Sequence, residues 1–312
     1  MCMRNVHMRR PTNSCGWAGL FCSYVTCLIA AGLVAANVIP YHIFFLPLLK
    51  AACLTGNASF TYYYYCIAMM LFAEVMVYGN FLLAIFTAPG YVPHEPWSRP
   101  PVFDGKEYSD NPFEVRQLDR QNKLRYCSLC EQFKPDNAHH CTMCGRCIYR
   151  MDHHCPWINN CVGRNNTKYF LLFVSYIPLG AFHIVLTTFF SAQFQLPSIN
   201  LFALEGDPVQ LLQLCFSMVF SLVMGFAFCA FASNFVWMAY RGETSMSRSI
   251  AAKLGPERAA EMNRLVREEQ LYEVFGADRR WWRLAFPFPP VRDHRGLPGY
   301  TVAATSALLH TV

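Results

Sequence analysis

The sequence predicts an all-α polytopic membrane protein with four transmembrane helices and a small cysteine-rich domain on the cytosolic side, between the second and third helices. Two observations support this fold class. Hydrophobic residues make up 54% of the 312 residues and charged residues only 15%, whereas soluble domains usually carry about 25% charged residues. In addition, seven of the fifteen cysteines fall between positions 127 and 161.

The apolar residues gather in four long blocks. A helix needs roughly 20 residues to cross the hydrocarbon core of a bilayer, and each block is longer than that. Buried helices of a large soluble protein are the alternative, but four such blocks seldom occur together in one. The predicted transmembrane helices span residues 17–38, 62–86, 169–194 and 211–237.

Two features of the membrane part, a short apolar segment and an intramembrane acidic residue, lead to separate predictions. The apolar piece 41–54 is shorter and is interrupted by Pro47 and Lys50, so we expect it to lie at the interface or on the lumenal side. Glu74 lies in the middle of the second block, where an ionisable side chain is costly. We expect polar groups of neighbouring helices to satisfy it in a structural role, and a functional role is the alternative.

The positively charged residues indicate the orientation. Three Lys or Arg residues precede the first helix, eleven lie between the second and third, and eleven follow the fourth, whereas the first loop has one and the loop 195–210 none. Because cytosolic loops carry the excess of Lys and Arg, the segments 1–16, 87–168 and 238–312 are predicted to face the cytosol. The net charge of +6 reflects this asymmetry and favours anionic lipid headgroups. It does not indicate a nucleic-acid partner.

The middle cytosolic segment divides into a linker and a cysteine-rich domain. Residues 87–126 are rich in proline, glycine and charged residues without a sustained periodicity, which is typical of a linker. Residues 127–168 hold the clustered cysteines together with four histidines. Structural disulfides are rare in the reducing cytosol, where clustered cysteines more often bind metal.

The spacing of these residues predicts two zinc sites. Zinc prefers tetrahedral sets of four thiolate and imidazole ligands, and a C-x2-C turn presents two sulfurs to one ion. Two sites of three cysteines and one histidine use eight of the eleven candidate ligands. The spacing assigns the first site to Cys127, Cys130, His140 and Cys147, and the second to Cys141, Cys144, His154 and Cys161.

This division leaves Cys155 without a metal, close to His153 and Asp152. A thiolate is the reactive form of cysteine, an imidazole can take its proton, and a carboxylate can orient that imidazole. The three residues are therefore candidates for a catalytic site built on an activated thiol. The alternative is a purely structural zinc module in which Cys155 is a ligand and another cysteine is spare.

The same segment resembles a known family. From Cys127 it reads C-x2-C-x3-K-P-x3-H-H-C-x2-C-x2-C-x4-D-H-H-C-P-W-x-N-N-C-V-G and continues to Tyr169 and Phe170, which is similar to the cysteine-rich domain of DHHC-type protein S-acyltransferases. The four-helix layout, with this domain between the second and third helices, resembles the family as well. So does the Val-Phe-Gly at Val274 in the tail, which tryptophans follow.

The resemblance implies a protein S-palmitoyltransferase that works in two steps. Acyl-CoA would transfer a long chain to Cys155 as a thioester, and a cysteine of a substrate protein would then take the chain. His153 would be the base, Asp152 would orient it, and the eight other ligands would hold two structural zinc ions. The expected partners are the bilayer, fatty acyl-CoA and substrate proteins with cysteines accessible at the cytosolic face. The expected location is the Golgi or endoplasmic reticulum membrane.

A long acyl chain would need a place among the helices. Apolar positions recur at helical spacing along the third helix and would share one face. Ordinary helix packing is the alternative explanation of this stripe. The residues expected to line an acyl cavity are Trp157, Phe170, Phe173, Ile177 and Gly180, the glycine leaving room deep in the groove.

Four positions depart from the family pattern. Ala88 stands at the first position of the D-P-G after the second helix, and Asn137 replaces an arginine after K-P. Ser247 replaces the carboxylate of the T-T-x-E after the fourth helix, and Gln270 replaces an asparagine before the tail's V-F-G. None of the four touches the proposed chemistry.

Two other classes of function compete with an enzyme. One is a catalytically silent membrane scaffold whose zinc domain binds partner proteins, and the other is a membrane zinc sensor or transporter. A scaffold has no need of the pair formed by Cys155 and His153, and the ligand-rich segment lies outside the predicted membrane helices. In the tail, residues 256–275 are expected to form a cytosolic helix.

Overall fold

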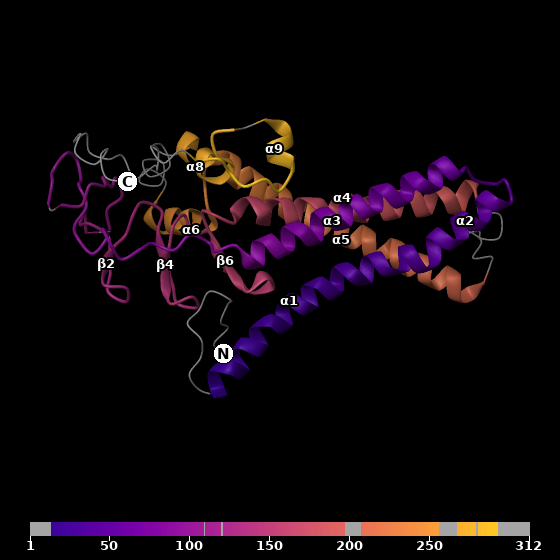
Figure 1. Ribbon diagram of the computed structural model, residues 1–312, viewed down its shortest axis with the longest axis horizontal. Helices are drawn as coiled ribbons and strands as arrows, with labels where there is room; N and C mark the ends of the chain where they lie inside the picture. The colour runs from indigo at the N-terminus through magenta and orange to yellow at the C-terminus, as the bar shows by residue number, and fades with distance from the viewer. Residues whose placement is uncertain are drawn as a thin grey trace. The chain divides into compact units, whose positions relative to one another are not determined.

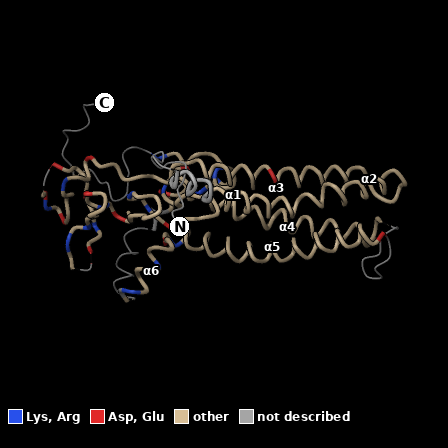
Figure 2. The backbone as a smooth tube through the Cα atoms, turned by 90° about the horizontal axis from the view of Figure 1, so that it is seen from below, with Lys and Arg blue, Asp and Glu red and all other residues tan. Residues whose placement is uncertain are grey.

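A computed structural model describes residues 14–108, 110–119, 121–196, 207–255, 267–278 and 280–292. Within these ranges it contains four helical segments long and apolar enough to cross a membrane: Tyr24–Leu54, Phe60–Phe86, Thr167–Phe194 and Pro208–Arg241. Charged residues are sparse along them (Figure 2). The predicted fold class, four membrane helices with a cysteine-rich segment between the second and third, is confirmed.

The chain divides into two compact units. The described residues within 27–82 and 171–235 form one, which we call the helical unit. The described residues within 1–26, 83–170 and 236–312 form the other, which we call the cysteine-rich unit.

The first helical segment does not end where its sequence suggested. Helix α1 (Ser14–Pro40) continues through one π-helical turn, η1 (Tyr41–Phe45), into α2 (Leu46–Leu54). Pro47 follows closely on this π-helical turn. A proline inside a helix removes one backbone hydrogen bond, and a local π-helical turn is one way in which a continuous helix accommodates the irregularity. The piece expected to lie separately at the interface is therefore a continuation of the first helix.

The other long helices are α3 (Phe60–Phe86), α4 (Thr167–Phe194) and α5 (Pro208–Arg241). In the helical unit, Tyr41, Phe45 and Leu49 are almost completely buried in an apolar cluster that also receives residues of α3, α4 and α5. Glu74 of α3 is hydrogen-bonded to the Nε2 atom of His42, so its polar partner comes from the π-helical turn.

Three short antiparallel hairpins build the middle of the cysteine-rich unit (Figure 1). Each pairs two consecutive strands of two or three residues. They are β1 (Tyr126–Cys127) with β2 (Gln132–Phe133), β3 (His139–Cys141) with β4 (Arg146–Ile148), and β5 (His153–Cys155) with β6 (Asn160–Val162). A 3-10 turn, η2 (Pro156–Ile158), connects β5 to β6.

The predicted linker packs onto these hairpins. Trp97 is completely buried and stacks on Phe113 with ring centroids 5.5 Å apart, and its Nε1 donates to the hydroxyl of Tyr149 at 3.0 Å. Tyr91 forms an isolated antiparallel bridge with Ile148 of β4. The linker thus covers the cysteine-rich strands with apolar side chains.

Three helices of the tail are described: α6 (Ser245–Leu254), α8 (Arg267–Phe275) and α9 (Trp281–Ala285). Of the helix predicted over residues 256–275, positions 256–266 lie outside the described residues and the remainder is α8. Gln270 lies in α8, but its side chain is also outside the described part.

Candidate active site and metal clusters

The hairpins bring the candidate ligands together through strand register. His140 faces Cys147 across β3 and β4, and His154 faces Cys161 across β5 and β6. Side chains directly opposite on one face of an antiparallel pair lie about 5 Å apart at their Cβ atoms. Each of these two hairpins therefore contributes one histidine and one cysteine to a common point.

The first cluster combines the β1–β2 turn with the next hairpin. The Nδ1 atom of His140 lies 3.5, 3.2 and 4.0 Å from the sulfurs of Cys127, Cys130 and Cys147. All four ligand atoms lie within 4.8 Å of one another. His140 and Cys147 come from β3 and β4, which are separated by only a tight turn, so the hairpin itself brings these two ligands together.

The second cluster repeats this arrangement one hairpin later. The Nδ1 atom of His154 lies 3.7, 3.5 and 3.5 Å from the sulfurs of Cys141, Cys144 and Cys161. The sulfurs of Cys144 and Cys161 are 3.5 Å apart. Each cluster thus joins one hairpin to the next along the chain.

Both clusters have the dimensions of a tetrahedral zinc site. With Zn–S distances of about 2.3 Å and Zn–N distances of about 2.0 Å, neighbouring ligand atoms of a tetrahedron lie roughly 3.5 to 3.8 Å apart. The distances from the histidine nitrogens to the sulfurs scatter around this range. The two sets of three cysteines and one histidine can therefore each hold one metal ion.

Strand alternation separates Cys155 from its neighbour His154. Successive side chains of a strand point to opposite faces, so His153 and Cys155 share one face of β5 while His154 lies on the other. Neither metal cluster includes Cys155, whose side chain is buried. The adjacent histidines consequently lie in two different environments.

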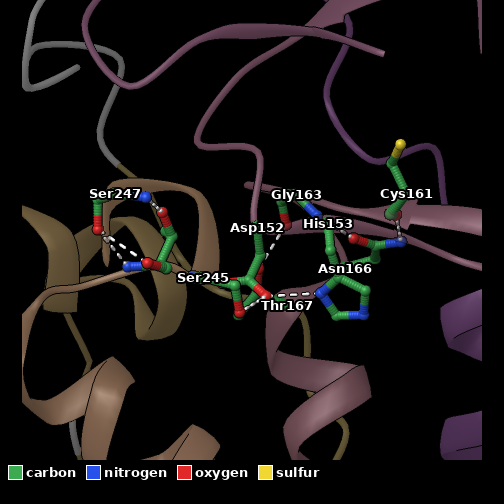
Figure 3. A network of polar contacts seen from close by, with 9 residues as sticks. Asp152, His153, Cys161, Gly163, Asn166, Thr167, Ser245 and Ser247 are labelled. Atoms are coloured by element: carbon green, nitrogen blue, oxygen red, sulfur yellow. Dashed lines mark hydrogen bonds and ion pairs between the residues drawn. The ribbon is translucent and has the colours of Figure 1, made fainter. Parts of the chain in front are cut away.

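His153 is held between a carboxylate and the Cys155 thiol. Its Nδ1 atom lies 2.6 Å from Oδ2 of Asp152 (Figure 3). Burial lowers the pKa of His153, but hydrogen bonds with Asp152 and Cys155 outweigh it and raise the pKa to about 9. For Asp152 burial acts to raise the pKa, and the hydrogen bond with His153 and the contact with Ser245 bring it below its ordinary value. An ionised carboxylate next to an imidazole stabilises the protonated ring.

Ser245 of the tail donates two further hydrogen bonds to the carboxylate of Asp152. Its backbone N–H donates to Oδ1 at 2.7 Å and its hydroxyl to Oδ2 at 3.1 Å (Figure 3). Ser245 is the first residue of α6, where backbone N–H groups lack helical partners and favour an anion. This contact was not predicted from the sequence, where its only signal is the pair of hydroxyl residues after the fourth helix.

The departure at Ser247 keeps the local structure of α6. Thr244 accepts a hydrogen bond from the backbone N–H of Ser247 at 3.0 Å, and the Ser247 hydroxyl accepts one from the N–H of Thr244 at 2.8 Å. A glutamate usually returns the second bond of such a capping box. The shorter serine makes the same bond here, so the helix start that carries Ser245 is preserved.

Two asparagines tie this site to the end of α3. The Nδ2 atom of Asn160 donates to the carbonyls of Ala84, Ile85 and Thr87 at 3.2, 3.1 and 2.9 Å, and Asn166 reaches the carbonyl of Ala84 at 3.3 Å. The last carbonyls of a helix have no partner within it. These two contacts were not predicted from the sequence, although the asparagine doublet before Cys161 is a signal for the first.

The residues expected to line an acyl cavity are distributed over both units. In the cysteine-rich unit, Trp157 is 49% exposed and Phe170 packs edge-on against the His153 ring at 5.4 Å. In the helical unit, the ring of Phe173 packs on that of Phe81, with centroids 5.0 Å apart.

Ile177 and Gly180 do line a cavity, of about 20 Å³, together with Met70, Glu74 and Met224. A cavity of this size has room for about one water molecule. It lies within the helical unit and is mostly apolar.

Comparison with known proteins shows which family has a similar sequence. The family model described as DHHC palmitoyltransferase matches residues 120–251, a range that contains all three hairpins. Probable protein S-acyltransferase 14 of Arabidopsis thaliana is 30% identical over 239 residues, which cover 74% of this chain and 70% of the relative.

Two shorter matches fall on smaller parts of the chain. Palmitoyltransferase PFA3 of Kluyveromyces lactis is 34% identical over 131 residues, 41% of this chain and 38% of the relative. Probable protein S-acyltransferase 16 of Arabidopsis thaliana is 38% identical over 103 residues, a third of each chain.

With its four membrane helices and the two cysteine and histidine clusters, the chain belongs to the DHHC palmitoyltransferase family and is a protein S-acyltransferase.

Proposed function

We propose that this enzyme transfers a long-chain acyl group from acyl-CoA to Cys155 and then from Cys155 to a cysteine of a substrate protein. The observation that supports these roles is the arrangement on β5. His153 and Cys155 share one strand face outside both metal clusters, and Asp152 holds the far side of the imidazole.

In the first step the thiolate of Cys155 attacks the carbonyl carbon of the acyl-CoA thioester. His153 takes the thiol proton; because Nδ1 is engaged by Asp152, Nε2 is the atom that exchanges it. The bond between the carbonyl carbon and the CoA sulfur breaks, and CoA leaves as a thiol after accepting that proton. Asp152 keeps the ring oriented and stabilises its charge.

In the second step a substrate cysteine repeats the attack on the acyl-Cys155 thioester. His153 accepts the proton of the incoming thiol, and Cys155 leaves as a thiolate. One thioester replaces another in both steps, so little free energy is released. The enzyme's contribution is to align and activate the two thiols.

The clusters suit a structural role for zinc. Two zinc ions, each bound by three thiolates and one imidazole, would supply closed tetrahedral centres that stabilise the hairpins. Cys161 of the second cluster lies on β6, the partner strand of β5. The ligands would therefore fix the strand that carries His153 and Cys155.

The acyl chain is proposed to lie along α4. Phe170, Ile177 and Gly180 recur at helical spacing along this helix, and Gly180 is 13 residues beyond its start at Thr167, roughly 20 Å at 1.5 Å per residue. The small cavity beside Gly180 has Met70 and Met224 in its wall. Methionine side chains are flexible and can move aside for a chain.

We further propose that the catalytic strand and both ends of the chain face the cytosol of a Golgi or endoplasmic reticulum membrane. The concentration of Lys and Arg in the segments on that side supports this orientation. CoA would then stay in water, and substrate proteins would present cysteines from the same side.

The test uses the full-length protein in detergent or nanodiscs with radiolabelled palmitoyl-CoA. We expect a hydroxylamine-sensitive label on the wild type that Cys155→Ser and Cys155→Ala both abolish. Cys229→Ser, which changes an exposed cysteine of α5, is the matched control and should label normally. A thioester label that persists in both Cys155 variants would assign the acyl group to another cysteine, and a wild type that takes no label would favour a scaffold.

A further inference from the structure

A loop of the tail carries exposed aromatic side chains that the transfer reaction does not use. Trp281 of α9 is 74% exposed, and Phe288, three residues after that helix, is 45% exposed. Exposed patches of large apolar side chains mark sites that bind proteins, membranes or ligands. Figure 1 shows α9 beside the first turn of α4.

This loop is held in one place by a buried lysine. The Nζ atom of Lys168 donates to the carbonyl of Arg283 and, at 2.7 Å, to that of Phe288. Lys168 is only 2% exposed. It is also the second residue of α4, one of the four helices that are long and apolar enough to cross a membrane. The aromatic loop is therefore fixed beside the N-terminal turn of this helix.

Hydrogen bonds also hold the two ends of this loop together. The N–H of Ala277 donates to the carbonyl of Val291 at 2.8 Å, and a Cβ atom on Gly276 would collide with that carbonyl oxygen. Arg292 donates to the carbonyls of Glu273 and Arg164. The loop is thus organised by its own contacts before any partner binds.

Positive charge accompanies the aromatic residues. The guanidinium groups of Arg280 and Arg283 lie 4.6 and 5.2 Å from the centre of the Trp282 ring, and both are paired with Asp278. The hydrogen bond from Arg280 holds the pKa of Asp278 at about 2, so this carboxylate is ionised and neutralises one of the two cations. The Arg280 side chain is 61% exposed.

Tryptophan with neighbouring arginine at the bilayer boundary is the composition of an interfacial anchor. Tryptophan rings are enriched at the level of the headgroups, and exposed Lys or Arg residues there attract anionic lipids. We propose that residues 280–288 form a membrane-contacting surface that binds anionic lipid headgroups beside the start of α4. This assignment concerns the tail and is independent of the chemistry at Cys155.

The test measures where the Trp281 ring lies in the full-length protein in nanodiscs. The emission of Trp281 is obtained as the difference between the wild type and Trp281→Phe. Discs contain phosphatidylcholine alone or a mixture with phosphatidylserine, at one fixed fraction of lipid brominated near the headgroup. Iodide serves as the quencher in water.

We expect brominated lipid to quench Trp281 strongly and iodide weakly, with lipid quenching greater in the anionic discs. When the phosphatidylserine fraction of the discs is varied, Arg280→Gln should need a roughly five-fold higher fraction for the same gain in lipid quenching, the effect of about one charge near the surface. Arg146→Gln, which changes an exposed arginine of β4, is the matched control and should need the same fraction as the wild type.

Three results would overturn the proposal. Quenching by iodide without quenching by brominated lipid would put Trp281 in water. Protection from both quenchers would mean that another segment or a second protein covers the loop. Equal lipid quenching in both kinds of disc would exclude recognition of anionic headgroups.

Discussion

Ser245 donates both its backbone N–H and its hydroxyl to the carboxylate of Asp152, 93 residues earlier in the chain. The same carboxylate accepts the hydrogen bond of His153 at 2.6 Å. The start of α6 therefore fixes the group that orients the imidazole, and Ser245 acts as a positioning residue through Asp152.

Ser245→Ala removes one of the three hydrogen bonds that Asp152 accepts. A hydrogen bond to a charged group contributes about 1.5 kcal/mol or more, so we expect self-acylation to slow by roughly ten-fold. Ser245→Thr restores the hydroxyl and should recover most of the rate. Single-turnover labelling with palmitoyl-CoA measures this effect.

Ser247→Ala is the matched control for that variant. It removes a reciprocal bond of the capping box, which costs about 1 kcal/mol of stability, but it leaves Asp152 untouched. We expect a lower melting temperature with a nearly normal transfer rate. If Ser247→Ala slowed labelling as much as Ser245→Ala, the effect would come from α6 as a whole rather than from the hydroxyl.

Asp152→Asn tests the orientation of the imidazole directly. The amide is close in size but cannot stabilise a protonated His153, so we expect self-acylation to fall by about 100-fold or more, the range of general acid–base contributions. Zinc content, measured by elemental analysis, should stay at that of the wild type. A variant that loses zinc along with activity would make Asp152 a structural residue.

The two clusters are expected to hold separate metal ions. Cys130→Ser and Cys161→Ser each remove one ligand from a different cluster, and a thiolate ligand is needed for a closed site. Each variant should fall from two zinc ions per chain to one and unfold at a lower temperature, as followed by elemental analysis and thermal unfolding. Unchanged zinc in either variant would exclude that cysteine as a ligand.

Gly180→Phe tests the acyl cavity. A Cβ atom at Gly180 would meet the Cβ of Ala73 at 3.4 Å and the Cε of Met70 at 3.8 Å, ordinary contacts, so a larger ring extends into the cavity that this glycine lines. We expect competition among acyl-CoA donors to shift toward shorter chains.

Gly79→Phe is the control for that change, since a Cβ atom there meets nothing within 4 Å. Its chain-length profile should match the wild type. An unchanged profile in Gly180→Phe would separate the acyl chain from this part of α4.

Much of the fold could be predicted from local sequence. The four blocks were long enough to predict membrane helices, because apolar length is a property of neighbouring residues. The end of the first helix was not predicted, since Pro47 signals an interruption in sequence, whereas the chain continues the helix through the π-helical turn that precedes this proline. Spacing also grouped the eight cysteines and histidines that the structure brings within ligand distance, because each hairpin is closed by a short turn.

The contacts that complete the site depend on residues distant in sequence. No local pattern connects Ser245 to Asp152 or Asn160 to the end of α3. Counting ligands also left two roles open for Cys155, a reactive thiol or a metal ligand with another cysteine spare. The separation of Cys155 from His154 follows from strand alternation on β5, which appears only once the strand and its register are known.

The central claim is that the acyl group passes through Cys155, and a pulse-chase experiment tests it most directly. Full-length enzyme is labelled with palmitoyl-CoA, freed of excess donor and mixed with a peptide that carries one cysteine, and the peptide containing Cys155 is followed by mass spectrometry. The account predicts that the 155-linked acyl group disappears as fast as acylated peptide forms, at a rate no slower than steady turnover. Acylated peptide that forms while the label on Cys155 persists, or that forms equally well with Cys155→Ala, would contradict it.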